Sequence, residues 1–205
     1  MANFNFGSFT KNRVEAFSDG VFAVVVTLLV FDLKFTHIDV ADNQKVWSGI
    51  LSTLPKLLSW INSFLIVCVI WMNHHRLMDM FKGINAGIFW LNNILLMFTS
   101  MIPFPTSLLG EYTNTNAAAC FYGLVLALPS LAFFILRLYV LKHKNLLSEA
   151  TSYPAYKKGT MLALYYGPVL YLTGAALSLV KPWLGLAVYF FVPVYFIFPR
   201  APQKN

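Results

Sequence analysis

Apolar residues fall into six long runs along this chain, separated by short polar or basic segments. An α-helix of about 20 residues crosses a hydrocarbon core of about 30 Å, and most of the runs reach that length. The pattern predicts an all-α, polytopic membrane protein, with residues 1–205 forming a single transmembrane domain. We expect six transmembrane helices at about 13–34, 47–77, 84–109, 117–141, 159–179 and 183–199.

The first run differs from the others because it carries an acid within its first turns. Asp19 precedes an uncharged stretch over 21–31, and a carboxylate in a spanning helix is costly unless it faces protein or water. Small side chains also recur at helical spacing in this run, at Ala16, Gly20, Ala23 and Thr27. Such residues let helices approach closely in lipid. We therefore expect this helix to lie centrally in an assembly, away from lipid.

The overall composition agrees with a membrane protein. Hydrophobic residues make up 58% of the chain and charged residues 11%, and the mean hydropathy is +0.64. A water-soluble domain carries about 25% charged residues. Cys68 and Cys120 both lie within apolar runs, so we interpret them as small buried side chains without a disulfide.

The net charge of +7 is better explained by membrane topology than by a nucleic-acid partner. If the N-terminus is cytoplasmic, 11 of the 15 Lys and Arg residues fall on the inner side, namely Lys11, Arg13, Arg76, Lys82, Arg137, Lys142, Lys144, Lys157, Lys158, Arg200 and Lys204. The outer side keeps Lys34, Lys45, Lys56 and Lys181. The positive-inside rule then predicts a multi-pass protein of the cell membrane with both termini in the cytoplasm and no nucleic-acid partner.

Two polar motifs meet at the inner end of the predicted bundle. They comprise Arg13, Phe17, Ser18 and Asp19 at the start of the first span, and Trp71, His74 and Arg76 at the end of the second. A buried Asp19 needs a donor or a cation, which His74 or Arg13 can supply. We interpret the set as a polar lock that fixes the tilt of the first helix. Helix packing without a gating role is the alternative, and proton sensing through His74 is a further hypothesis.

The same motifs resemble those of a known family. The run Arg13-x-x-x-Phe17-Ser18-Asp19-Gly20 before an apolar helix is similar to the first-helix signature of the transmembrane protein 175 family, which are cation channels of bacteria and of eukaryotic endolysosomes. Trp71-x-x-His74-x-Arg76 is the second match, and the chain length fits single-repeat bacterial members. The resemblance implies a modest preference for potassium over sodium. It also implies an apolar constriction about one and a half turns past the acid, at Val24.

A pore requires several copies of the first helix, because one helix cannot enclose a channel. We expect a homotetramer that conducts potassium and other monovalent cations through a pore lined by Val24, Thr27, Leu28 and Phe31. Apolar constrictions gate by dewetting, and the Thr27 hydroxyls can replace part of the hydration shell of an ion. The alternative is an ordinary lipid-facing or core stripe.

Three acids follow the first span, at Asp32, Asp39 and Asp42. Their negative potential can concentrate cations at the outer mouth. A solvated loop without that role is an equally simple interpretation.

No enzymatic activity, cofactor or metal site is expected, and permeant K⁺ is the only small ligand. The adjacent His74 and His75 point about 100° apart on a helix and form a poor metal site, and no Walker loop, GxSxG or GxGxxG occurs. The rival function is a secondary transporter with a substrate site near Asn92 among Pro-broken helices. A proton-permeable channel and a scaffold without flux are further alternatives. For Asn92 and Asn93, hydrogen bonding between helices is the simpler interpretation.

Overall fold

The computed structural model describes residues 10–33 and 42–197, and every named element in this part of the chain is helical. The predicted all-α fold is therefore confirmed. The elements in chain order are α1 (Lys11–Leu28), η2 (Leu29–Asp32), α2 (Asn43–Ser52), α3 (Leu54–Asp79), α4 (Ala86–Ser100), α5 (Pro103–Glu111), α6 (Asn116–Lys142), η3 (Lys144–Leu146), α7 (Tyr153–Leu164), η4 (Tyr165–Val169), α8 (Leu170–Val180) and α9 (Pro182–Ile197).

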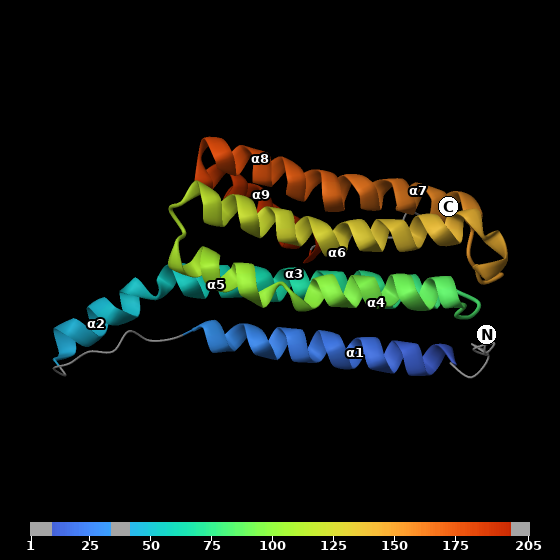
Figure 1. The fold of residues 1–205 in the computed structure, drawn as a ribbon, viewed down its shortest axis with the longest axis horizontal. Coiled ribbons are helices and arrows are strands. Elements are labelled where there is room, and N and C mark those ends of the chain that lie inside the picture. The colour runs from blue at the N-terminus through green and yellow to red at the C-terminus, as the bar shows by residue number, and fades with distance from the viewer. Residues whose placement is uncertain (1–9, 34–41, 198–205) are drawn as a thin grey trace, which may run out of the picture.

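Five helical stretches are long and apolar enough to cross a membrane: Lys11–Phe31, Asn43–Asp79, Ala86–Glu111, Asn116–Lys142 and Tyr153–Val180. The sixth, Pro182–Phe196, is shorter, and the 16 residues of α9 extend about 24 Å. The chain runs back and forth along one axis (Figure 1), so that α1, α4 and α7 begin at the end of the bundle where α3 and α6 finish. We call this end the basic end, because Lys11, Arg76, Lys82, Lys142 and Lys144 lie near it.

Proline explains where several helices begin. The predicted second span divides at Thr53 into α2 and α3, and Pro55 lies in the first turn of α3. The predicted fifth span begins earlier than residue 159, because Pro154 opens α7 within its first turn. The fixed φ of proline suits the first turn of a helix, where its missing N–H has no helical acceptor.

Pro129 does not interrupt α6, which continues through it to Lys142. The Ser130 hydroxyl donates to the Leu126 carbonyl at 3.0 Å, within the turn that proline perturbs. The facing stretch of η4 is π-helical and contains Gly167 and Pro168. Gly167 lies so close to α6 that a Cβ on it would be 3.1 Å from the Ser130 Cβ. The proline-containing turn of α6 therefore faces the π-helical turn of η4.

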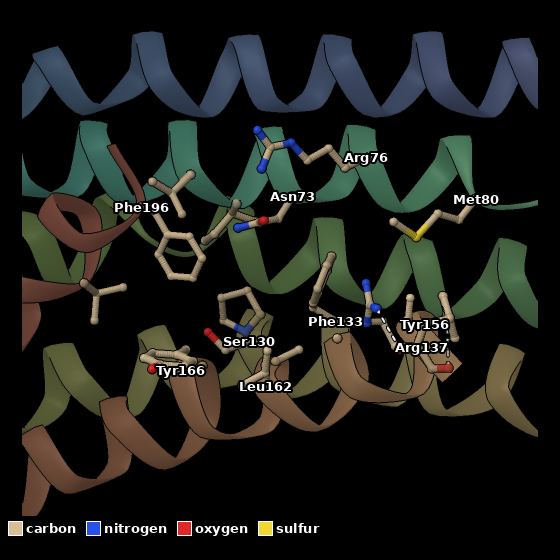
Figure 2. Close-up of a pocket in the computed structure, with 18 of the residues that line it drawn as sticks. Asn73, Arg76, Met80, Ser130, Phe133, Arg137, Tyr156, Leu162, Tyr166 and Phe196 are labelled. Atoms are coloured by element: carbon tan, nitrogen blue, oxygen red, sulfur yellow. Dashed lines mark hydrogen bonds between the residues drawn. The ribbon is translucent and has the colours of Figure 1, made fainter. Parts of the chain in front are cut away.

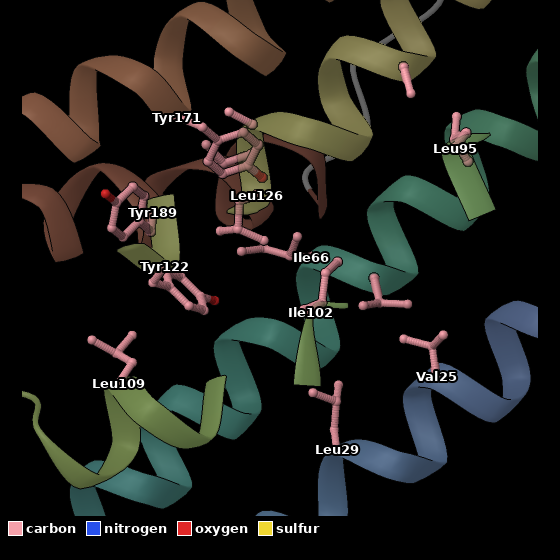
Figure 3. Packing of buried hydrophobic residues seen from close by; sticks show 14 of the residues in the cluster. Val25, Leu29, Ile66, Leu95, Ile102, Leu109, Tyr122, Leu126, Tyr171 and Tyr189 are labelled. Atoms are coloured by element: carbon pink, nitrogen blue, oxygen red, sulfur yellow. The ribbon is translucent and has the colours of Figure 1, made fainter. Parts of the chain in front are cut away.

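The core is organised around α6, which packs against α3, α4, α5, α7, α8 and α9. Figure 3 shows Tyr122 and Leu126 of α6 among buried side chains from α1, α3, α8 and α9. Tyr189 of α9 fits against two glycines, since a Cβ on Gly123 of α6 or Gly174 of α8 would collide with its ring. Its hydroxyl donates to the Ala119 carbonyl at 3.1 Å. Cys68 and Cys120 are free and half-buried.

The first helix lies at the edge of this bundle and packs mainly on α3 and α4 (Figure 1). Its buried positions are Val14, Ser18, Phe22 and Val25, which recur every three or four residues and so form one face of the helix. Within one copy of the chain, α6 is the central helix and α1 is peripheral. A central position for α1 requires other copies.

Candidate functional site

A buried hydrogen-bond network ties the basic half of α1 to the rest of the bundle. The amide Nδ2 of Asn92 on α4 donates to the Ser18 Oγ at 3.0 Å, and the His74 Nε2 on α3 donates to the Asn92 Oδ1 at 2.7 Å. Ser18 in turn donates to the Val14 carbonyl at 2.8 Å. All three network side chains are almost completely buried. The Phe22 ring lies 5.3 Å from the His74 ring and covers it on the α1 side.

Asp19 lies beside this network and is not part of it. Its partner is the indole of Trp71, whose Nε1 donates to the carboxylate at 2.8 Å. His74 and Arg13 were the donors expected from the sequence, but His74 bonds to Asn92 instead and Arg13 is exposed. The Asp19–Trp71 pair is also exposed in a single copy of the chain. It borders a groove of about 310 Å³ between α1 and α3.

The two arginines of the motifs do not join the network. Within the described residues, neither Arg13 nor Arg76 bonds to Ser18, Asp19 or His74. Arg13 points away from α3 and α4, on the exposed face of α1. Arg76 lines a separate cavity between α3, α6, α7 and α9. The two motifs are therefore adjacent, as expected. The buried hydrogen bonds that involve them, at Ser18 and His74, include no arginine or carboxylate, and the carboxylate of Asp19 bonds to Trp71 at the surface.

The proposed pore-lining residues are all exposed in this chain, and they lie on α1 and, for Phe31, on the following η2. Val24 is 55% exposed and Phe31 is 70% exposed, and Leu28 and Thr27 are exposed between them. The Thr27 hydroxyl donates to the Val24 carbonyl at 2.8 Å, so its oxygen can still accept. Phe17, which we grouped with the polar motif, is exposed on α1 as well.

The acids expected at the outer mouth are only partly described. Asp42 is exposed at the start of α2, and α2 lies at the end of the bundle opposite to the basic end (Figure 1). Asp32 ends η2, but its side chain lies outside the described part of the chain, as does the whole of Asp39.

Asn92 is the network member that the motifs did not include. In the sequence, the only indication of its role is that it is an amide side chain in the middle of an apolar run, a position that favours hydrogen bonding between helices. Both its amide groups are now occupied, by Ser18 and His74, and the side chain is fully buried. It lines neither the groove beside Asp19 nor the cavity beside Arg76. Among the described residues, no group of three His, Cys, Asp or Glu side chains is placed to hold a metal ion.

Comparisons with known proteins place these features in context. Residues 13–103 match the family model described as the endosomal/lysosomal potassium channel TMEM175. The chain is 34% identical over 188 residues to a potassium channel of Chamaesiphon minutus, which covers 90% of this chain and 92% of that protein. A stretch of 116 residues is 36% identical to the human endosomal/lysosomal proton channel TMEM175, covering 54% of this chain and 22% of the human protein.

The fold also matches a solved structure. The crystal structure of a lysosomal potassium-selective channel TMEM175 homologue from Chamaesiphon minutus superposes with a TM-score of 0.81 at 32% identity. The superposition covers 91% of this chain and 96% of that chain. The similarity therefore extends over most of the chain and not only over the two motifs.

Proposed function

The chain belongs to the TMEM175 family of membrane channels, and we propose that it conducts cations passively, with a preference for potassium, through a homotetrameric pore lined by α1. The observation that carries this proposal is the division of α1 into two faces. One face is held by α3 and α4 through Ser18, Asn92 and His74. The other leaves Val24, Thr27 and Leu28 exposed, and Phe31 of the adjoining η2 is exposed as well.

Four copies of α1 around an axis would bring the exposed faces together. Val24, with Leu28 and Phe31, then forms an apolar constriction, and water leaves the pore at this point when the constriction is narrow. Thr27 contributes hydroxyl oxygens to the same lining. The proton of each hydroxyl is already donated to the Val24 carbonyl. The hydroxyl oxygen is therefore free to act as a ligand to a cation through its lone pairs. Asp32, Asp39 and Asp42 would raise the cation concentration at the opposite mouth.

We propose a role for the polar contacts as a lock on the tilt of α1. The buried Ser18–Asn92–His74 network fixes the helix at the basic end, and the Asp19–Trp71 bond fixes it from the adjacent side. Neighbouring copies would cover the Asp19–Trp71 pair, which a single copy leaves exposed. Arg13, on the uncovered face, would lie near the inner mouth of such a pore.

The proposed setting is the cell membrane, with residues 1–205 acting as a single transmembrane domain and both termini in the cytoplasm. The basic end of the bundle supports this orientation through the positive-inside rule. Passive conduction requires no catalytic group and no cofactor other than the permeant K⁺. The partners are further copies of the same chain and the surrounding lipid.

Flux from liposomes that contain the purified protein tests the proposal. Potassium-loaded and sodium-loaded vesicles are compared, each with a proton ionophore and a pH-sensitive dye. We expect potassium efflux to exceed sodium efflux and to rise in Val24→Ala, because a smaller ring lowers the dewetting barrier. Val194→Ala on α9 is the matched control, since Val194 is exposed to a similar degree and does not lie on α1.

Two results would overturn this assignment. Equal efflux from wild-type and Val24→Ala vesicles would remove Val24 from the constriction. Efflux no greater than from empty vesicles, with folded and inserted protein, would remove the channel function and leave a transporter or a scaffold.

Proton conduction is a second candidate, favoured by the name of the human relative, a proton channel. The same vesicles report it when the ionophore is omitted. Acid influx that is driven by a potassium gradient and abolished in empty vesicles would assign proton permeation to this chain. A requirement for the ionophore would exclude proton permeation.

A further inference from the structure

A second cavity lies away from α1, between α3, α6, α7 and α9, and its volume is about 620 Å³. Figure 2 shows Phe196, Tyr166 and Ser130 at one end and Arg137, Tyr156 and Met80 at the other. Along α6 the lining extends from Pro129 to Arg137, a distance of about 12 Å. The cavity is therefore elongated along the helices, and Arg137 lies toward the basic end of the bundle, whereas Arg76 extends from α3 toward Asn73 (Figure 2).

Arg137 is a buried cation without an anionic partner in the described chain. Only 8% of its surface is exposed. Its Nε donates to the Thr160 hydroxyl at 3.3 Å and its Nη2 to the Tyr156 carbonyl at 3.3 Å, and the guanidinium lies 4.6 Å over the Tyr156 ring. Gly159 makes room for it, because a Cβ there would be 2.8 Å from Nη2. These contacts position the guanidinium but leave most of its donors and its charge unmatched.

A second arginine, Arg76 of α3, lines the same cavity. The acids near this end of the bundle are bound by other side chains: Glu15 lies 3.6 Å from Lys11, Asp79 3.9 Å from His75, and Glu149 3.8 Å from Lys82. Among the described residues, no carboxylate comes within the 4.0 Å of an ion pair with either arginine. The cavity therefore contains two positive charges and no negative one.

Most of the remaining lining is apolar or aromatic, including Ile70, Phe133, Leu162 and Val192, and its polar side chains are Asn73, Ser130, Thr151 and Ser152. An unpaired charge within spanning helices is costly, and arginine binds phosphate through paired N–H donors. A free phosphate would satisfy the arginines and leave the apolar length empty. A phospholipid satisfies both parts, with its phosphate at Arg137 and an acyl chain along the apolar walls. Basic pockets between helices on the cytoplasmic side are suited to lipid head groups.

We propose that this cavity is a binding site for an anionic phospholipid, held at its phosphate by Arg137 and by the apolar walls along one acyl chain, with Arg76 adding positive charge to the same cavity. The occupant is a component of the bilayer and not a permeant ion. The site is remote from the exposed face of α1, so it is distinct from the proposed pore.

Native mass spectrometry of the protein, titrated with phosphatidylglycerol in neutral detergent, tests the site. Arg76→Gln and Arg137→Gln are compared with Lys158→Gln, which removes the same charge from an exposed position at the same end of the bundle. We expect each arginine variant to weaken phosphatidylglycerol binding about tenfold or more, with Lys158→Gln unchanged. Arg76 is exposed, so its variant keeps the test valid if Arg137→Gln does not fold.

Two further ligands identify the source of the phosphate. Phosphatidylcholine should bind more weakly than phosphatidylglycerol, because its choline offsets the phosphate charge. Glycerol phosphate, which has the anion but no acyl chain, should also bind more weakly than phosphatidylglycerol. Ala163→Phe fills part of the cavity wall and should weaken the binding of the lipid without changing the binding of glycerol phosphate. Equal binding of phosphatidylglycerol to wild type and to both arginine variants would overturn the proposal. Glycerol phosphate binding as tightly as the lipid would overturn it in favour of a simple anion site.

Discussion

Replacing Asn92 with alanine tests the buried link between α1, α3 and α4. The Asn92 side chain makes two interhelical hydrogen bonds, to His74 and to Ser18. Asn93 provides a matched control, because its Nδ2 donates at 2.8 Å to the Phe89 carbonyl of its own helix. The two variants make the same chemical change one residue apart on α4. They differ in the partners that are lost.

The expected loss for Asn92→Ala is about 2–3 kcal/mol of unfolding free energy. Two hydrogen bonds between membrane helices contribute about 0.6 kcal/mol each on average. His74 then keeps a buried N–H without its acceptor, which costs a further ~1–2 kcal/mol. Ser18 still donates to the Val14 carbonyl, so the loss of its bond to Asn92 leaves no unpaired donor and adds little to the loss of unfolding free energy. In Asn93→Ala, the higher helix propensity of alanine, about 0.6 kcal/mol, offsets the intrahelical bond that is lost.

Unfolding in mixed micelles, followed by circular dichroism as the SDS fraction rises, measures the two losses. We expect Asn92→Ala to unfold at clearly lower SDS and Asn93→Ala to stay within about 0.5 kcal/mol of wild type. A double-mutant cycle of Asn92→Ala with His74→Ala should give a coupling energy of about 1 kcal/mol. Equal unfolding free energies for the two asparagine variants would refute the network, and zero coupling would refute the bond to His74.

Two other substitutions extend this ranking in the same micelle assay. In a single copy of the chain, Trp71→Phe removes the donor to an exposed Asp19 carboxylate. It should lower the unfolding free energy of dissociated chains by less than about 1 kcal/mol, since water replaces the indole. A larger loss than for Asn92→Ala would contradict that order. Gly123→Ala should cost about 1–3 kcal/mol because the new methyl group meets the Tyr189 ring. Gly83→Ala, where a Cβ meets nothing within 4 Å, is its control, and equal effects of the two would show that α9 does not pack there.

The helices were predictable because a chain in lipid must satisfy its backbone hydrogen bonds within each segment. Length and apolarity then identify the spans without knowledge of their neighbours. The short irregularities were less predictable. Pro129 leaves α6 continuous, whereas Thr53 separates α2 from α3, because the outcome depends on what surrounds each freed carbonyl group and not on the proline alone.

The candidate site was predictable as a region but not as a set of bonds. Topology brings the two motifs to one end of the bundle, as the sequence indicates. The partner of Asp19 is Trp71 rather than His74 or Arg13, because the partner depends on how α1 is rotated against α3. The sequence identified these residues without indicating that rotation.

Taken alone, the sequence determined the all-helical membrane fold and the family, since these depend on local apolarity and on short motifs. Tertiary structure decided which of two adjacent asparagines bonds to His74, because neighbouring residues on a helix point about 100° apart. It also decided that Arg76 and Arg137, which the sequence presents as topology signals, line one cavity. These residues, 61 positions apart in the sequence, border the same cavity because α3 and α6 both form its walls.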